Sequence, residues 1–193
     1  MMIGAVPVWR LLLDTIRDPA EVARILLRLE LKGDVLWMAL GLVVTLSVLV
    51  AAVLGMAVPA SDELTEPPIA LTPFMYAMIL GGSLIIMVFA LHFTGLMLGG
   101  QARFEDTLTL VVWLQFLLLA LQVAQTATFL LMPPLAGMAT IAAIAIVLWV
   151  LVNFINEGQR FGSLGRAAAT SVLAILGMGL GLSFLISLIT AGL

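Results

Sequence analysis

The sequence predicts an all-α integral membrane protein, with five transmembrane helices preceded by short amphipathic interfacial helices. Hydrophobic residues make up 63% of the 193 residues and charged residues only 10%, which is not the composition of a soluble globular chain. Five long stretches contain no Asp, Glu, Lys or Arg, and each has about the 20 residues that a helix needs to cross a bilayer. These stretches are residues 35–58, 72–98, 108–131, 135–155 and 167–191.

The N-terminal part of the chain differs from the rest because charges interrupt its apolar runs. Trp9 and Leu13 recur at helical spacing, whereas Arg10 lies on another face of the same helix. A helix of this kind lies in the membrane interface with its apolar side in lipid. We therefore predict two domains: cytoplasmic amphipathic helices at the interface in residues 1–34, and a five-helix transmembrane domain in residues 35–193.

A second short helix is expected to begin after Asp18. The Asp18 side chain is of the type that caps a helix, Pro19 suits the first helical position, and Glu21 is placed to complete a capping box. Val22 then begins an apolar stripe, with arginines displaced from it. Anchoring to the membrane is the simpler role for these helices, and a docking surface for a cytoplasmic partner is the alternative.

Two loops on one side of the predicted membrane domain differ in length and charge. The first and second spans are joined by an acidic loop that contains Asp62, Glu63 and Glu66. The third and fourth spans are separated only by Pro133 and Pro134, and adjacent prolines favour a tight turn. The third and fourth spans should therefore form a hairpin with almost no loop.

The orientation of the bundle follows from its cationic residues. All eight Lys and Arg residues fall before the first span or in the two loops on the same side as the N-terminus. Because such residues accumulate on the cytoplasmic side, the N-terminus is expected in the cytoplasm and the C-terminus outside.

A few polar side chains interrupt the apolar spans. His92 is the only histidine, near the cytoplasmic end of the second span, and Gln115, Gln122 and Thr126 form a polar stripe on the third. Such residues are candidate intramembrane polar contacts between helices; proton relay by His92, or a polar cavity lined by the glutamines, is the functional alternative.

Small residues in the spans point to close helix packing. Gly95 with Gly99, and Gly177 with Gly181, each form a Gly-x-x-x-Gly pattern, which lets two helices approach closely. The pattern is common in membrane helices, so it fits packing within the bundle at least as well as dimerisation. These four glycines are the candidate helix-packing positions.

Several classes of function are excluded or disfavoured by what the chain lacks. It has no cysteine, so disulfides and thiolate metal sites are absent, and its net charge of −3 provides no basic surplus for nucleic acid. No carboxylate lies in a predicted span, although coupled transport and aspartyl chemistry generally use one or two. We therefore predict no catalytic residue, no cofactor and no metal, and hence no enzymatic activity.

Two loops on the predicted cytoplasmic side pair an arginine with a phenylalanine. They are Arg103-Phe104, before the third span, and Arg160-Phe161, before the fifth. Together with the N-terminal helices they make one candidate recognition surface. Its residues are Arg24, Arg28, Arg103, Phe104, Arg160 and Phe161.

The arrangement resembles the Ypt-interacting protein (YIP) membrane family. The likeness rests on a short helix initiated by Asp18-Pro19, five spans with the C-terminus outside, and the Gly-Gly-x-x-x-Phe loop formed by Gly99, Gly100 and Phe104. The resemblance covers residues 18 to about 191 and implies an integral membrane protein, of the prokaryotic type within this family. Eukaryotic members bind prenylated Rab-type GTPases during vesicle traffic, whereas prokaryotic members have no settled activity.

One lysine beside seven arginines, with heavy use of Ala, Leu and Gly, suggests a GC-rich bacterial genome and hence the bacterial cytoplasmic membrane. The leading hypothesis is a non-enzymatic protein that binds other membrane proteins as an accessory subunit, assembly factor or scaffold. Its partners would be the bilayer and other integral membrane proteins, with a homo-oligomer also open. The alternative is a small permease or channel-like transporter, in which the glutamine stripe and the histidine face a shared pathway.

Overall fold

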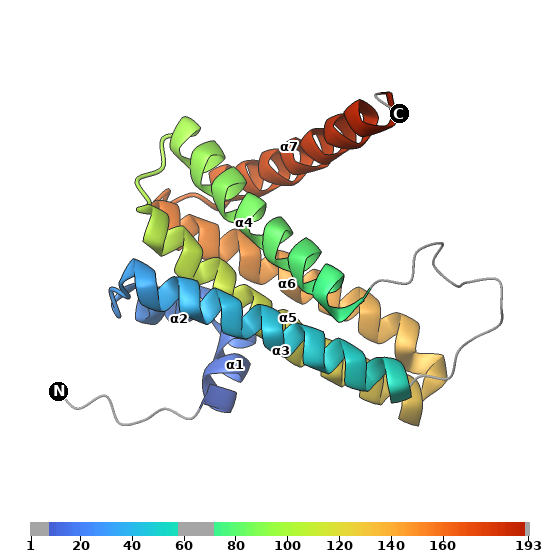
Figure 1. The fold of residues 1–193 in the computed structure, drawn as a ribbon. Helices are drawn as coiled ribbons and strands as arrows, with labels where there is room; N and C mark the ends of the chain where they lie inside the picture. Colours follow the sequence, from blue (N-terminus) through green and yellow to red (C-terminus); the bar gives the residue numbers. More distant parts are fainter. Residues whose placement is uncertain (1–7, 58–71, 192–193) are drawn as a thin grey trace.

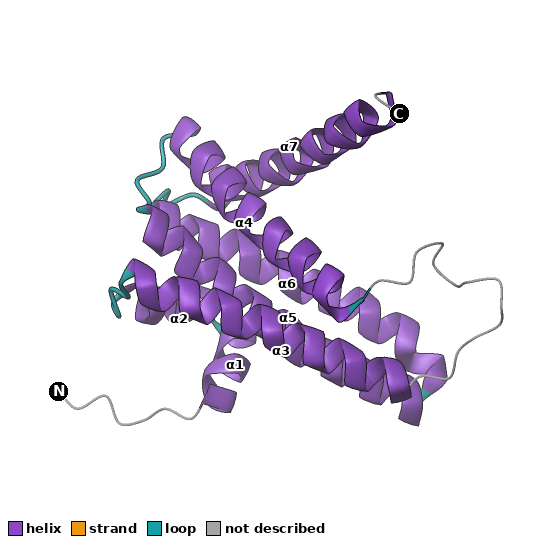
Figure 2. Cartoon of the chain, in the orientation of Figure 1, coloured by secondary structure: helices purple, strands orange, loops and turns teal. Residues whose placement is uncertain are grey.

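The protein is a bundle of long helices with two short helices against its side (Figure 1). The structure, a computed structural model, describes residues 8–57 and 72–191, with the backbone alone for residues 56–57, 181–182 and 184–191. All regular elements in these described residues are helical (Figure 2). They are α1 (Val8–Arg17), α2 (Pro19–Leu27), α3 (Gly33–Ala57), α4 (Pro73–Met97), α5 (Phe104–Leu131), the short 3₁₀ helix η1 (Pro133–Leu135), α6 (Ala136–Gln159) and α7 (Leu164–Ala191).

The prediction of an all-helical membrane protein is confirmed, and within the described residues four helical segments have the length and apolarity needed to cross a bilayer. These segments are Gly33–Gly55, Pro73–Met97, Phe104–Leu131 and Pro133–Gln159. The fifth predicted span corresponds to α7, whose side chains are described mainly over Leu164–Leu180, an apolar stretch that is too short by itself to count as a span. A total of five spans therefore stays a prediction. The acidic loop with Asp62, Glu63 and Glu66 lies outside the described residues.

Side chains from nearly every helix meet in one buried cluster. Leu36 of α3, Leu91 of α4, Leu108 of α5 and Phe154 of α6 are each almost completely buried there. The two prolines form η1 and turn α5 back onto α6, as a tight hairpin requires. Helix α7 packs on α4 and α6. The long helices are therefore held by side chains that interlock close to the ends where α5 begins and α6 finishes.

The short helix α2 is part of this packing rather than a separate layer. It packs against α5 and α6, and Val22, Ala23 and Leu26 belong to the same buried cluster as the long helices. Its start follows two of the three sequence signals: Pro19 is the first helical residue, and the carboxylate of Asp18 accepts a hydrogen bond of 3.0 Å from the backbone N–H of Glu21. The predicted capping box is wrong, because the N–H of Asp18 donates to the carbonyl of Asp14 at 2.7 Å and the carboxylate of Glu21 pairs with Arg24 instead. Burial of α2 fixes the course of the chain into α3.

We expect Asp18→Ala to lower the free energy of unfolding by about 1 kcal/mol, because the substitution removes the acceptor at the N-terminus of α2. Unfolding of the detergent-solubilised protein by increasing SDS, followed by circular dichroism, measures the change. Asp18→Asn is the matched control, because asparagine caps helices about as well as aspartate. Equal losses in the two variants would show that the negative charge, rather than the capping bond, carries the effect.

A candidate recognition site at the charged end of the bundle

The cationic residues outside α1 gather at one end of the bundle. There α4 and α6 finish, and α3, α5 and α7 begin (Figure 1). We call this the charged end and define it by its cations. They are Arg24, Arg28, Lys32, Arg103, Arg160 and Arg166. The site is built mainly by the two loops at this end, one between α4 and α5 and the other between α6 and α7.

The α4–α5 loop is folded by its two glycines and its phenylalanine. Gly99 has φ +87°, a conformation that glycine adopts without strain, and it ends α4. The N–H of Gly100 then donates to the carbonyl of Gly95 at 2.9 Å. Phe104 begins α5, and its ring lies 5.1 Å from that of Phe89 and 5.6 Å from that of His92. The Gly-Gly-x-x-x-Phe loop is thus closed onto α4 at both of its ends.

Gln159, the last residue of α6, joins this loop to α6. Its side chain is 1% exposed, its Oε1 accepts a hydrogen bond of 3.3 Å from the N–H of Ala102, and its Nε2 donates to the carbonyl of Leu91 at 3.4 Å. Its backbone carbonyl also accepts from the N–H of Gln101 at 3.0 Å. A Cβ atom at Gly95 or Gly100 would overlap the Gln159 side chain. The two glycines therefore leave the space that this glutamine fills.

The α6–α7 loop turns sharply and is anchored by its own aromatic residue. Arg160 has φ +57°, and the side-chain carbonyl of Asn156 accepts a hydrogen bond of 2.9 Å from the N–H of Ser163. Phe161 is 5% exposed, and the guanidinium of Arg166 lies 5.8 Å from the centre of its ring. In both loops the phenylalanine holds the loop to the bundle, while the adjacent arginine remains exposed.

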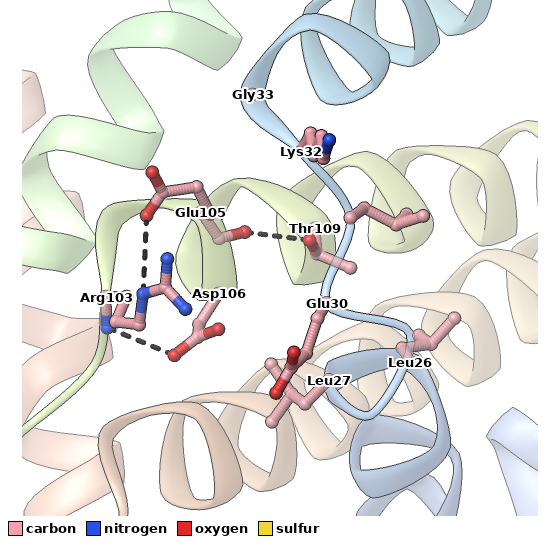
Figure 3. A pocket seen from close by; sticks show the side chains of 10 residues that line it. Leu26, Leu27, Glu30, Lys32, Gly33, Arg103, Glu105, Asp106 and Thr109 are labelled. Atoms are coloured by element: carbon pink, nitrogen blue, oxygen red, sulfur yellow. Dashed lines mark hydrogen bonds and ion pairs between the residues drawn. The ribbon is translucent and has the colours of Figure 1, made fainter.

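A cavity of about 240 Å³ opens between the α2–α3 connection and the start of α5 (Figure 3). Its walls combine apolar side chains of α2 with charged side chains of the α2–α3 connection and of the start of α5. The lining residues are Leu26, Leu27, Glu30, Leu31, Lys32, Gly33, Arg103, Glu105, Asp106 and Thr109. Asp106 accepts a hydrogen bond of 3.1 Å from the N–H of Arg103, and the Arg103 guanidinium lies 3.8 Å from a carboxylate oxygen of Glu105. Glu105 and Asp106 lie in the first turn of α5, where the helix dipole favours negative charge.

Charge at this end is balanced rather than basic. The six cations of the charged end are matched by six acids on the same segments. These acids are Glu21, Glu30, Asp34, Glu105, Asp106 and Glu157. Only two of the arginines take part in ion pairs within the described residues: Arg24 with Glu21 at 3.2 Å, and Arg103 with Glu105 at 3.8 Å. The surface therefore offers a pattern of alternating charges for specific pairing, with little long-range attraction of either sign.

The structure places the predicted recognition residues in two groups. Arg24, Arg28, Arg103 and Arg160 are exposed at the charged end. Phe104 is half-buried and Phe161 is buried, because both rings pack onto the bundle. The exposed part of the candidate surface is therefore made of arginines, and the two aromatic residues hold the loops that carry Arg103 and Arg160 against the bundle.

The predicted intramembrane polar residues are spread along the helices. The amide of Gln115 on α5 donates to the hydroxyl of Ser47 on α3 at 3.4 Å, and Gln122 and Thr126 lie half-buried further along α5. His92 packs edge-on against Phe104, and its Nδ1 is buried without a hydrogen-bond partner within the described residues. The structure thus joins Gln115 to a neighbouring helix and His92 to the α4–α5 loop.

We expect Gln115→Leu to lower the free energy of unfolding only slightly, by about 0.6 kcal/mol, because a single hydrogen bond between membrane helices contributes about that much. Ser47→Ala should lower the free energy of unfolding by a similar amount. The double variant should lose no more stability than the more destabilised of the two single variants. SDS unfolding of the three variants measures this coupling. Strictly additive losses would mean that the two side chains do not interact.

The predicted packing glycines have different surroundings. Gly95 is buried against Gln159, and Gly99 supplies the turn that ends α4. Gly177 has no atom of the described residues within 4 Å of a Cβ position, and Gly181 lies where only the backbone is described. Gly158, which the sequence patterns do not single out, lies close to Leu110 of α5.

Two contacts that shape the site escape sequence patterns. Gln159 follows no motif, since a glutamine directly beside Arg160 and two residues after Glu157 looks like an ordinary exposed residue. Thr15 of α1 is fully buried, and its hydroxyl accepts a hydrogen bond of 3.0 Å from the indole N–H of Trp113 on α5. For Thr15 the available signal was a polar residue within an apolar face of an amphipathic helix.

Comparison with known proteins gives one match. The Yip1 domain matches residues 13–185, which is most of the chain and includes both loops of the charged end. No curated protein and no solved structure matches the chain significantly. The folded Gly99-Gly100-x-x-x-Phe104 loop and the extent of the matched region lead to one conclusion: this chain is an integral membrane protein of the Yip1 domain family.

Proposed function

We propose that this protein is a non-enzymatic member of its family that binds other membrane proteins, as an accessory subunit, assembly factor or scaffold, through the charged end. We place it in the bacterial cytoplasmic membrane, with the N-terminus in the cytoplasm and the C-terminus in the periplasm. The charged end would then face the cytoplasm, because cationic residues accumulate on that side.

One observation carries the proposal: side chains packed onto the bundle hold two loops whose arginines stay exposed. Gln159 and Phe104 fix the α4–α5 loop, and Phe161 fixes the α6–α7 loop. Arg103 and Arg160 are displayed from these fixed positions. A pre-organised surface loses less conformational entropy on binding, so such a construction suits recognition of a partner.

The chemistry of the surface also limits the kind of partner. Because six cations are balanced by six acids at this end, a partner with one dominant charge would gain little. A partner segment with charges of both signs could form ion pairs with Arg103 and Arg160 while avoiding Glu105 and Asp106. We therefore expect a membrane protein that presents such a mixed segment at its cytoplasmic surface.

Gentle extraction from native membranes tests the proposal. The tagged wild-type protein, a variant with Arg103→Gln and Arg160→Gln, and a control with Met138→Gln at the opposite end would be separated by native electrophoresis. Associated proteins would be identified by mass spectrometry. Met138 is 69% exposed near the start of α6, so its substitution changes a surface far from the charged end.

The proposal predicts that wild type and the Met138 variant migrate with the same second membrane protein, and that the double arginine variant migrates without it. Migration of all three proteins without a partner would contradict a binding role. In that case, flux measurements on Gln115→Leu and Gln122→Leu would test transport as the alternative.

A further inference from the structure

Helix α1 lies beside the middle of a candidate span, not beside its end. The hydroxyl of Thr15 accepts the hydrogen bond from Trp113, which is about 14 Å along α5 from its first residue. Helix α1 and α5 also line a common apolar groove of about 370 Å³ that extends to Ala124, about 11 Å from the last residue of α5. Figure 1 shows α1 extending from the flank of the bundle.

This position differs from the interfacial location that the amphipathic pattern alone suggests. The hydrocarbon core is about 30 Å thick, and α5 is long and apolar enough to cross it. Helix α1, whose side chains meet α5 at Trp113 and across the groove as far as Ala124, therefore reaches the depth of the hydrocarbon core. At that depth, charged side chains are rare, and they almost always pair with other charged or polar groups.

Three charged side chains of α1 are nevertheless exposed: Arg10, Asp14 and Arg17. They occupy one side of the helix, because Asp14 follows Arg10 by four residues and precedes Arg17 by three. The structure shows no ion pair for any of them within the described residues, and the Arg10 guanidinium lies 5.3 Å from the centre of the Trp9 ring. Large apolar side chains adjoin this charged side, with Trp9 58% and Leu13 47% exposed.

We propose that a second copy of this chain covers this face, with two α1 helices packed antiparallel about a two-fold axis. In that arrangement Arg10 of each copy pairs with Asp14 of the other, and the exposed rings and aliphatic groups beside them are buried together. A two-fold interface needs a self-complementary surface, and a helix with both signs of charge one turn apart provides one.

Charge complementarity favours a second copy over a lipid. The phosphate of an anionic lipid would satisfy the arginines but would be repelled by Asp14, and it would have to leave the headgroup layer to reach this depth. Arg10 is chosen over Arg17 because Arg17 ends α1 and directly precedes Asp18, the cap of α2. This inference is independent of the partner proposed for the charged end, because the charged end is made of residues outside α1.

Charge reversal provides the test. Two differently tagged copies of the full chain would be co-expressed, extracted in a mild detergent, and purified through one tag; the fraction of the second tag that is retained measures self-association. Arg10→Asp alone and Asp14→Arg alone should each lower this fraction at least about tenfold, because each places like charges opposite one another in both pairs.

The two single variants should associate with each other when they are co-expressed. In that mixed pair, the aspartate introduced at position 10 of one chain faces the arginine introduced at position 14 of the other, and the unchanged Asp14 and Arg10 form the second pair. The double variant with both reversals should also associate with itself. Restored association shows that the single variants are folded. Equal retention in all combinations, no retention for wild type, or no restoration in the mixed pair would each overturn the proposal.

Discussion

Gly100→Ala should destabilise the protein by about 1–3 kcal/mol, although alanine is normally the better residue near a helix. A Cβ atom at this position would lie 2.8 Å from the carbonyl oxygen of Gly95 and would overlap the side-chain amide of Gln159. The backbone contact cannot be relieved by a rotamer change, so the loop itself must move. SDS unfolding of the purified protein measures the loss.

Gly82→Ala is the matched control. Gly82 lies on α4, as Gly95 does. Among the described residues no atom lies within 4 Å of its Cβ position, so this variant should be unchanged or more stable by up to about 1 kcal/mol. Gly95→Ala should fall between the two, because the three atoms nearest to its Cβ position all belong to the side chain of Gln159 and none to the backbone. A Gly100 variant as stable as the Gly82 variant would mean that the loop is not held against α6.

Gln159→Leu should also destabilise the protein by about 1–3 kcal/mol, because it leaves the buried N–H of Ala102 without its acceptor. The carbonyl of Leu91 loses its additional donor as well. Leucine is close in size to glutamine, so loss of packing is a small part of the effect. Beyond stability, the α4–α5 loop should become more open, and hydrogen exchange at residues 99–104 should become faster.

Gln125→Leu controls for the general effect of placing leucine in a membrane helix. Gln125 lines an apolar groove between α5 and α6, so the substitution should leave stability unchanged or raise it. Hydrogen exchange of the α4–α5 loop should match wild type in this control. Faster exchange of residues 99–104 in both variants would point to a general loosening of the bundle instead of the loss of one buried amide.

The helices themselves are largely predictable from the sequence, since long uncharged runs have few alternatives to a helix in a bilayer. The predicted span at 108–131 begins four residues late, because the helix extends back to Phe104 through Glu105 and Asp106, whose charges excluded them from the apolar run. Asp18 and the proline pair likewise act locally, and the structure agrees with both.

The packing of the site was harder to predict, because it depends on residues far apart in the chain. Gln159 is 57 residues from Ala102, and Thr15 is 98 residues from Trp113. No periodicity within one helix reveals such pairs. The same limit applies to the two loop phenylalanines: the sequence shows that each directly follows an arginine, but only the folded chain shows that Phe161 is buried while Arg160 beside it is exposed.

The most direct test of the proposed binding role is site-specific photo-crosslinking in native membranes. A photoreactive amino acid would replace Arg103, which is exposed at the charged end, or Met138, which is exposed near the opposite end. We predict that the probe at position 103 links to a second membrane protein and that the probe at position 138 links to lipid. Lipid adducts alone at both positions would contradict recognition through the charged end.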